Sequence, residues 1–256
     1  MSFVNRRTFL RSAAAAATGA FFSACERLTS SPKIHTILGG TESLDLRLHR
    51  ALFRKTLARE FPASAISLEF RANGTTDPDT DSYRQLAANQ FADWRLEIGG
   101  LVEHPLSLSL DDLRQAPGRT QITRHDCVEG WSCVGKWRGA SLGALLDRAG
   151  LKPGARYIAF MCADTLEETS DGSGQYYETI DLDDAYHPQT ILAYEMNDQA
   201  LPIAHGAPLR LRLERQLGYK MAKYIMRIDA IENFSRLGRG QGGYWEDRGY
   251  EWYAGI

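Results

Sequence analysis

Several features that mark common functional classes are missing from this 256-residue sequence. The net charge is −2, so the sequence has no basic footprint and nucleic-acid binding is not expected. No run of 18 or more apolar residues occurs, so no transmembrane helix is expected. The sequence also lacks GxGxxG and GxxxxGK followed by Ser or Thr, and thus has neither a dinucleotide fingerprint nor a P-loop.

Cysteine is scarce, with four residues at positions 25, 127, 133 and 162. They form no CxxCH haem motif, no iron–sulfur run and no closely spaced zinc set with histidine. In an oxidising compartment a Cys133–Cys162 disulfide is conceivable. Without that bridge, Cys133 is expected to be a core cysteine.

Cys127 lies in the stretch RHDCVEGWSC at 124–133, which we expect to be a loop between a strand and a helix. Its neighbours His125, Asp126 and Glu129 are polar or charged, which is unusual around a structural core thiol. As a thiolate, Cys127 could be a nucleophile or a ligand of a soft metal. His125 is two residues away, but this proximity alone is weak support for a nucleophile–base pair.

The N-terminus, MSFVNRRTFLRSAAAAATGAFFSAC, is typical of an export signal over residues 1–25. Arg6-Arg7 followed by Thr-Phe-Leu resembles a twin-arginine (Tat) signal, which predicts periplasmic localisation. The Tat route carries folded proteins, often with a cofactor already loaded. The signal could end at either of two places. A lipobox-like FSAC would put a lipid anchor on Cys25, whereas cleavage among small residues near Thr18–Ala20 would not.

The rest of the chain predicts an α+β fold with a mixed β-sheet core, short helices and long loops. Residues 26–65 are expected to be a linker with a helix at 46–60, 66–232 the main domain, and 233–256 an exposed or wrapping Gly-rich aromatic tail. Residues 66–86 are loop-rich. Helices are expected at 109–115 and 141–151, and strands at 94–102, 119–125, 155–163, 190–197, 207–216 and 222–234.

A second cluster of candidate residues lies in HGAPLRLRLERQLGYKMAKY, at 205–224. His205, Arg210, Lys220 and Lys223 flank glycines there. These cations could belong to solvated strands, with their stems covering apolar surface. They could equally form an anion-binding loop, in which backbone N–H groups and lysine charges hold a phosphate.

Taken together, CVEGWSCVGKWRGASLGALL, HPQTILAYEMN and HGAPLRLRLERQLGYKMAKYI resemble the molybdopterin-dependent oxidoreductases of the sulfite-oxidase fold. Within that family the chain is similar to the Tat-exported branch of periplasmic protein-methionine-sulfoxide reductase catalytic subunits. The resemblance spans about residues 66–232. It implies a molybdenum–molybdopterin cofactor and a sulfite-oxidase-type molybdopterin-binding fold.

The resemblance also assigns candidate site residues. Cys127 matches the cysteine whose thiolate binds molybdenum, which makes it the candidate metal ligand and catalytic residue. The candidate pterin-binding residues are His205, Arg210, Met221, Ala222, Lys223, Cys162, Arg71 and Asn73. Cys162 stands where the methionine-sulfoxide-reductase branch has Thr, so this position departs from the pattern. One thiolate suffices for such a cofactor because the pterin supplies the other sulfurs, and buried cations would balance its negative charge.

The function implied is oxygen-atom or two-electron transfer, with reduction of a small or protein-bound sulfoxide as the first candidate. Electrons would come from a separate partner, for which a membrane haem protein is one candidate. The alternatives are oxidation of a small oxyanion such as sulfite, with Arg124 and Arg138 as candidate anion ligands, and a non-catalytic binding lipoprotein on this fold. Glu129, Trp131, His125 and Arg124 are candidate lining residues of the substrate pocket. Little chain follows residue 232, so a monomer is expected.

Overall fold

The computed structural model describes residues 48, 50, 56–170, 172 and 174–256. The chain divides into two compact units, Met1–Phe53 and Arg54–Ile256, and the fold given below is that of the second unit. The predicted signal, the lipobox-like Cys25 and most of the expected helix at 46–60 lie outside the described residues. In the described part, no helix has the length and apolar character needed to cross a membrane.

The first of two sheets is mixed and has five strands in the order β2-β1-β10-β5-β6. β1 and β10 run parallel, with Ile98 opposite Ile228, and the other neighbours are antiparallel. The strands are β1 (Leu96–Gly100), β2 (Leu106–Leu108), β5 (Tyr157–Thr165), β6 (Gln175–Asp181) and β10 (Ile225–Ile231).

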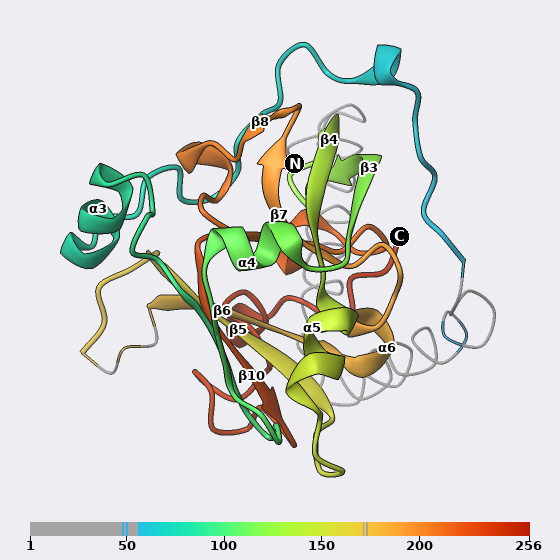
Figure 1. Cartoon of the computed structure of the whole chain (residues 1–256). Coiled ribbons are helices and arrows are strands. Elements are labelled where there is room, and N and C mark those ends of the chain that lie inside the picture. The colour runs from blue at the N-terminus through green and yellow to red at the C-terminus, as the bar shows by residue number, and fades with distance from the viewer. Residues whose placement is uncertain (1–47, 49, 51–55, 171, 173) are drawn as a thin grey trace, which may run out of the picture. The chain divides into compact units, whose positions relative to one another are not determined.

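The second sheet has the order β3-β4-β7-β8, and β9 pairs with β7. It is antiparallel throughout, and β3 and β4 form a long hairpin (Figure 1). Its strands are β3 (Gly118–Asp126), β4 (Ser132–Ser141), β7 (Ile191–Met196), β8 (Gln199–Ala200) and β9 (Arg210–Arg212). The hairpin ends at Cys127, so this sheet delivers the candidate metal ligand.

Short helices connect the strands, and their ends follow from side-chain caps. Ser109 and Asp112 form a reciprocal capping box at the start of α4, and Ser141 accepts from the N–H of Ala144 at the start of α5. The helices are α3 (Asp81–Ala88), α4 (Leu110–Gln115), α5 (Leu142–Ala149) and α6 (Leu182–Ala185), with 3-10 turns η1 (Ala63–Ala65), η2 (Ile203–His205), η3 (Gly218–Lys220) and η4 (Glu246–Arg248).

The main core packs residues of both sheets together with the helices α4 and α5, and contains Trp94, Leu113, Leu146, Phe160 and Leu192. A smaller cluster around Trp137 lies on the second sheet, and Phe70 of the early loop packs against it. The sequence prediction of an α+β fold with mixed sheets and short helices is confirmed.

Several predicted elements need correction. Residues 56–60 are not helical, and 81–88 of the loop-rich stretch form α3, capped by Thr80. The expected strand at 207–216 is reduced to Arg210–Arg212. Cys127 connects two strands rather than a strand and a helix, because residues 132–141 form β4.

The cysteine expectations also change. Cys127, Cys133 and Cys162 are all free thiols, so the Cys133–Cys162 bridge does not form. Cys162 is fully buried, whereas Cys133 is only half-buried and lies 3.9 Å from the carbonyl oxygen of Glu69. Cys133 is therefore not a core residue, because the hairpin places it at the rim of the sheet.

The C-terminal tail, residues 233–256, wraps along the first sheet and back to the η3 region. Gly243 bridges to Glu178 of β6, and the N–H of Tyr244 donates to the carbonyl of Tyr177 at 3.0 Å. Farther on, the N–H of Leu217 donates to the carbonyl of Ala254 at 2.9 Å. The tail is thus fixed by backbone hydrogen bonds in its middle and near its C-terminal end.

Candidate active site

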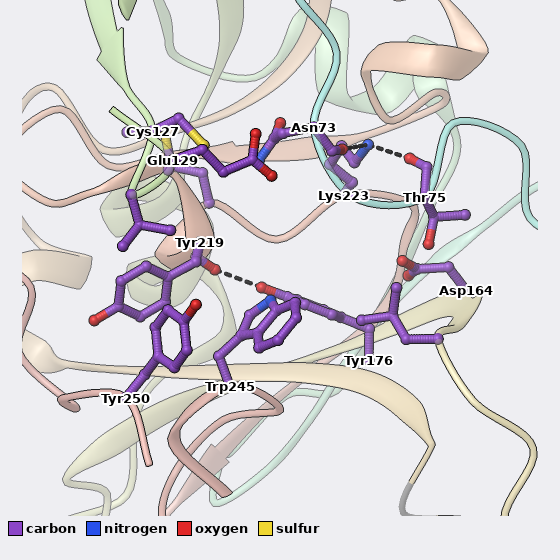
Figure 2. A pocket seen from close by; sticks show the side chains of 15 residues that line it. Asn73, Thr75, Cys127, Glu129, Asp164, Tyr176, Tyr219, Lys223, Trp245 and Tyr250 are labelled. Atoms are coloured by element: carbon purple, nitrogen blue, oxygen red, sulfur yellow. Dashed lines mark hydrogen bonds between the residues drawn. The ribbon is translucent and has the colours of Figure 1, made fainter. Parts of the chain in front are cut away.

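A pocket opens beside Cys127 and encloses about 720 Å³ of empty space, part of it open to solvent. Its walls come from the early loop, the β3–β4 hairpin, β5, β6, the η3 segment and the tail (Figure 2). The lining residues are Asn73, Gly74, Thr75, Cys127, Val128, Glu129, Asp164, Leu166, Tyr176, Gly218, Tyr219, Met221, Lys223, Trp245 and Tyr250.

The CVEGW turn presents the Cys127 thiol at the tip of the hairpin. The N–H of Cys127 donates to the carbonyl of Trp131 at 2.9 Å, and the N–H of Gly130 donates to the carbonyl of Cys127 at 3.0 Å. Gly130 has φ +85°, a conformation that glycine adopts without the strain of a side chain. The local sequence therefore closes a tight turn with the sulfur at its edge.

Cys127 is only 7% exposed, and its environment is that of a ligand more than of a nucleophile. Burial raises the pKa of the thiol, although the backbone N–H groups of Glu129 and Val128 work in the opposite direction. A thiol with a raised pKa is a poor nucleophile near neutral pH. A bound metal ion, by contrast, displaces the thiol proton on coordination.

His125 lies fully buried on β3, two residues before Cys127, and does not line the pocket. Its Nδ1 is 3.1 Å from Nη1 of Arg212 and 3.3 Å from Sδ of Met221. Burial, followed by the charge of Arg212, holds the pKa of His125 well below its usual value. His125 is therefore a neutral ring that supports the hairpin and the Met221 segment.

Lys223 projects into the pocket from the segment after η3 and ties down the early loop. Its Nζ donates to the carbonyls of Asn73 at 2.7 Å and of Thr75, and to that of Ala204 at 3.3 Å (Figure 2). Burial, together with the positive charge of Arg210, lowers the pKa of Lys223 to about 7. An anion placed beside this lysine would therefore stabilise its charged form.

Arg210 is a buried cation with open hydrogen-bonding capacity. Its Nη1 donates to the carbonyl of His205 at 2.9 Å, but in the described part of the chain Nε and Nη2 have no partner. Burial, followed by repulsion from Arg212, lowers the pKa of Arg210 to about 9, which still leaves it charged at neutral pH. A buried guanidinium with two unused donors fits an anionic group such as a phosphate.

Arg210 and Lys223 approach each other over Gly206. A Cβ in place of the glycine hydrogen would lie 2.9 Å from Cβ of Lys223 and 3.2 Å from Cβ of Arg210. Gly206 also has φ +109°. Only glycine lets both cations converge here, and their convergence makes a place for a buried anion.

Asp164, on β5, is the buried acid of the pocket. Burial raises its pKa to about 6, against the weaker opposing effects of a Thr75 hydrogen bond and the Lys223 charge. The carboxyl of Asp164 can therefore exchange a proton near neutral pH.

An aromatic wall faces this polar side of the pocket and consists of Tyr176, Tyr219, Trp245 and Tyr250. Figure 2 shows Tyr219, Tyr250 and Trp245 gathered together, away from Thr75 and Asp164. The Tyr176 hydroxyl donates to the carbonyl of Tyr219. The ring of Tyr250 lies 5.1 Å from that of Tyr219 and 5.2 Å from that of Trp245. The wall is a continuous π surface open to solvent at Tyr250.

The structure brings part of the residue set predicted from the sequence into one pocket. Asn73, Cys127, Met221 and Lys223 line it. The other predicted residues lie around it: Ala222 and Arg210 are buried beside it, Cys162 is in the core two residues before Asp164, His205 packs on Phe70 at 5.5 Å, and Arg71 lies 5.4 Å above the Trp131 ring.

Of the residues suggested for the substrate pocket, Glu129 lines it. Arg124 instead bonds Asp126 at 2.9 Å, and Arg138 lies 3.5 Å from Glu195 on the second sheet. Neither Asp164 nor the aromatic wall was predicted from the sequence. Strand periodicity could have flagged Asp164, two residues after Cys162, as a residue on the same face of β5.

Comparison with known proteins identifies the family of this domain and several similar proteins. The oxidoreductase molybdopterin binding domain matches residues 84–236. YedZ1 of Azospira oryzae, provisionally described as a protein-methionine-sulfoxide reductase subunit, is 39% identical over 78% of this chain and 68% of its own length. The protein-methionine-sulfoxide reductase catalytic subunit MsrP of Xanthomonas axonopodis is 36% identical over 60% of this chain and 49% of its own.

The chain therefore spans about half the length of its MsrP relatives. Among solved structures, the sulfane dehydrogenase SoxCD from Paracoccus pantotrophus is similar, with a TM-score of 0.49 and 24% identity over 56% of this chain and 39% of that one.

Proposed function

The chain belongs to the oxidoreductase molybdopterin-binding domain family, and on that premise we propose that it reduces sulfoxides at a molybdenum–molybdopterin centre held through Cys127. Family membership confirms the predicted class, an oxidoreductase enzyme that binds molybdopterin. The sulfoxide substrate, the electron partner and the export route belong to the proposal.

The residues around the pocket fit such a cofactor. Cys127 offers one buried thiol without a disulfide partner, and Arg210 has two buried donors without a partner in the described chain. Arg210 and Lys223 would neutralise the pterin phosphate, while Cys127 would supply the thiolate ligand. The chemistry that this cofactor supplies when bound is two-electron oxygen-atom transfer.

The charges that line the pocket favour a sulfoxide over sulfite as the substrate. Its charged lining residues are two acids, Glu129 and Asp164, and one lysine, Lys223. Lys223 is already engaged by backbone carbonyls, and both arginines suggested for an oxyanion lie elsewhere. Lys223 is thus the one cation among the described residues that line the pocket, so sulfite finds little charge compensation there, whereas a neutral sulfoxide needs none.

The reduction needs two protons as well as two electrons, since sulfoxide, two electrons and two protons yield sulfide and water. Asp164 is placed to hold one proton at the polar side of the pocket, with a pKa of about 6. The aromatic wall, with Leu166 and Val128, gives the other side of the pocket a largely apolar lining. The protein thereby positions the substrate and supplies a proton.

The two electrons would come from a separate redox protein, in line with the description of the MsrP relatives as catalytic subunits. A membrane haem protein fits that role. The Arg-Arg-Thr-Phe-Leu stretch at residues 6–10 supports work in the periplasm after twin-arginine export, and a lipid on Cys25 would hold the enzyme at the membrane.

Steady-state assays of the purified holoenzyme test the proposed reaction. With a reduced viologen dye as donor, we expect turnover of N-acetylmethionine sulfoxide and of dimethyl sulfoxide. With ferricyanide as acceptor, sulfite oxidation should be at least about a hundredfold slower in kcat/KM, as a charge-mismatched substrate would be. Efficient sulfite oxidation without sulfoxide reduction would overturn the proposal in favour of the oxyanion alternative.

Arg210→Gln should weaken cofactor retention without harming the fold. Loss of charge-assisted bonds worth about 1.5–3 kcal/mol predicts roughly 10- to 100-fold weaker pterin retention, measured as pterin fluorescence after extraction. The cofactor-free variant should be at least as stable as the wild type, because an unpaired buried charge disappears.

Arg212→Gln is the matched control for Arg210→Gln. Arg212 donates hydrogen bonds to Glu214 at 2.9 and 2.6 Å in the core. Removing the arginine leaves the buried Glu214 carboxylate without a cation and should lower the melting temperature. If Arg210→Gln kept its pterin and lost stability as Arg212→Gln does, the role of Arg210 as an anion ligand would be wrong.

A further inference from the structure

Two residues of the aromatic wall come from the C-terminal tail, beyond the residues that the family domain matches. The domain match ends at residue 236, whereas Trp245 and Tyr250 line the pocket beside Cys127. Tyr250 is 38% exposed, and Trp245 is half-buried. The outer part of the pocket is therefore built from chain that the shared domain does not contain.

An ion-pair latch fixes the tail at this place. Nζ of Lys220 lies 2.5 Å from a carboxylate oxygen of Glu178 and 2.5 Å from one of Glu246, and all three side chains are buried. Glu246 directly follows Trp245, and Lys220 directly follows Tyr219 of the wall. The hydroxyl of Tyr219 also donates to the carbonyl of Glu251 at 2.7 Å. These contacts hold Trp245 in a defined position over the pocket.

The composition of the wall indicates what it can bind. Its faces are aromatic, and Lys223 and Asp164, two charged residues that line the pocket, lie away from Tyr219, Tyr250 and Trp245 (Figure 2). Aromatic rings bind alkyl and aryl groups by burial, and they make favourable contacts with divalent sulfur. A methyl group alone would leave most of this surface uncovered.

We propose that the tail determines substrate specificity: Trp245 and Tyr250 bind the apolar arm of the sulfoxide and select substrates that carry one. The substrate class is then a neutral sulfoxide with an alkyl or aryl arm, such as an oxidised thioether side chain, in preference to a minimal dialkyl sulfoxide. This proposal rests on the proposed sulfoxide reduction and adds the residues that discriminate among sulfoxides.

The test compares two sulfoxides in the purified holoenzyme, methyl p-tolyl sulfoxide with a large arm and dimethyl sulfoxide without one. Trp245→Leu and Tyr250→Leu should each raise KM for the tolyl substrate roughly tenfold, the loss of about one sulfur–aromatic or ring contact. The kcat/KM for dimethyl sulfoxide should fall by a smaller factor, so the ratio of the tolyl value to the dimethyl sulfoxide value should drop severalfold. Molybdenum content should equal that of the wild type in both variants.

Trp252→Leu is the matched control from the same tail. Trp252 does not line the pocket, and its ring stacks on Phe234 at 5.9 Å while its indole N–H donates to Thr179 at 2.9 Å. It should leave the ratio of the two kcat/KM values unchanged. Tyr250 is partly exposed, so Tyr250→Leu is expected to fold even if Trp245→Leu does not.

Binding without turnover gives a second readout. Methyl p-tolyl sulfide should quench tryptophan fluorescence of the wild type and not of Trp245→Leu. The wild type could reduce dimethyl sulfoxide while both wall variants keep its preference for the tolyl substrate. In that case the role of Trp245 and Tyr250 in specificity is wrong, and the proposed sulfoxide reduction still stands. If the wild type reduces neither sulfoxide, the proposed function fails and the tail proposal fails with it.

Discussion

Cys127→Ser should abolish turnover while leaving most of the pterin bound. A serine hydroxyl is a hard, weakly acidic ligand and does not replace a thiolate on a soft metal centre. We expect kcat/KM to fall by about three orders of magnitude, or ~4 kcal/mol of transition-state stabilisation. The pterin should stay because Arg210 and Lys223 hold its anionic part independently of the thiol. Viologen-linked sulfoxide reduction and pterin fluorescence of the same preparation measure the two effects.

Cys133→Ser is the natural control for this change. Cys133 is free and half-buried, and it lies outside the pocket although it belongs to the same hairpin. It should keep full activity. If Cys127→Ser and Cys133→Ser had equal turnover, the ligand role of Cys127 would be refuted.

Lys220→Met should cost about 3–5 kcal/mol of unfolding free energy, because it leaves Glu178 and Glu246 facing each other in the core without a cation. Lys152→Met, at an exposed position, should change stability by less than about 0.5 kcal/mol. Urea unfolding of the two variants and the wild type gives the comparison. A Lys220→Met curve that overlays that of Lys152→Met would contradict the latch.

The defect of Lys220→Met should also grow with pH. Burial, followed by the Glu246 charge, raises the pKa of Glu178 well above its usual value, and Lys220 opposes this rise. A raised carboxyl pKa means that the folded state holds the proton to higher pH, so stability falls as pH increases above the ordinary carboxyl range. Without Lys220 that pKa rises further, and the variant should differ from the wild type less at pH 5 than at pH 8.

Adding Glu178→Gln and Glu246→Gln to Lys220→Met removes all three charges. This triple variant should regain most of the lost stability at pH 8, since no buried charge is left unpaired. Failure to recover would mean that Lys220 stabilises the fold through packing of its stem and not through its charge.

Some features of the fold and the site could be predicted from local signals in the sequence. Ser109 with Asp112 and Ser141 with Gly150 mark the ends of α4 and α5, because caps act within four residues. Cys127 could be singled out because a lone thiol stands among polar neighbours in a motif shared with a known family. Both kinds of signal are contained in a short stretch of chain.

Elements that depend on distant partners were missed. β6 contains Glu178, whose burial is possible only because Lys220, 42 residues later, pairs with it. In β4, the glycines 135 and 139 and the cations Lys136 and Arg138 break the apolar alternation expected of a strand. Strand pairing with β3 and β7 overrides that weak local preference.

The aromatic wall could not be predicted for the same reason. Trp245 and Tyr250 stand in a Gly-rich stretch that is typical of exposed tails. The Glu246–Lys220 pair, together with hydrogen bonds that link the tail to β6 and to Tyr219, brings them to the pocket. Likewise, the spare donors of Arg210 become visible only once its buried surroundings are known. Sequence identified the cationic segment, and three-dimensional packing determined which cation is left without a partner.

The metal content of the purified protein shows whether the chain is a molybdenum–pterin enzyme whose metal is held by Cys127. Elemental analysis of wild-type protein that reduces sulfoxides should give about one molybdenum and one pterin per chain, with X-ray absorption at the molybdenum edge showing one sulfur ligand fewer in Cys127→Ser. Sulfoxide reduction by a preparation without molybdenum, or an unchanged sulfur shell in Cys127→Ser, would contradict the account.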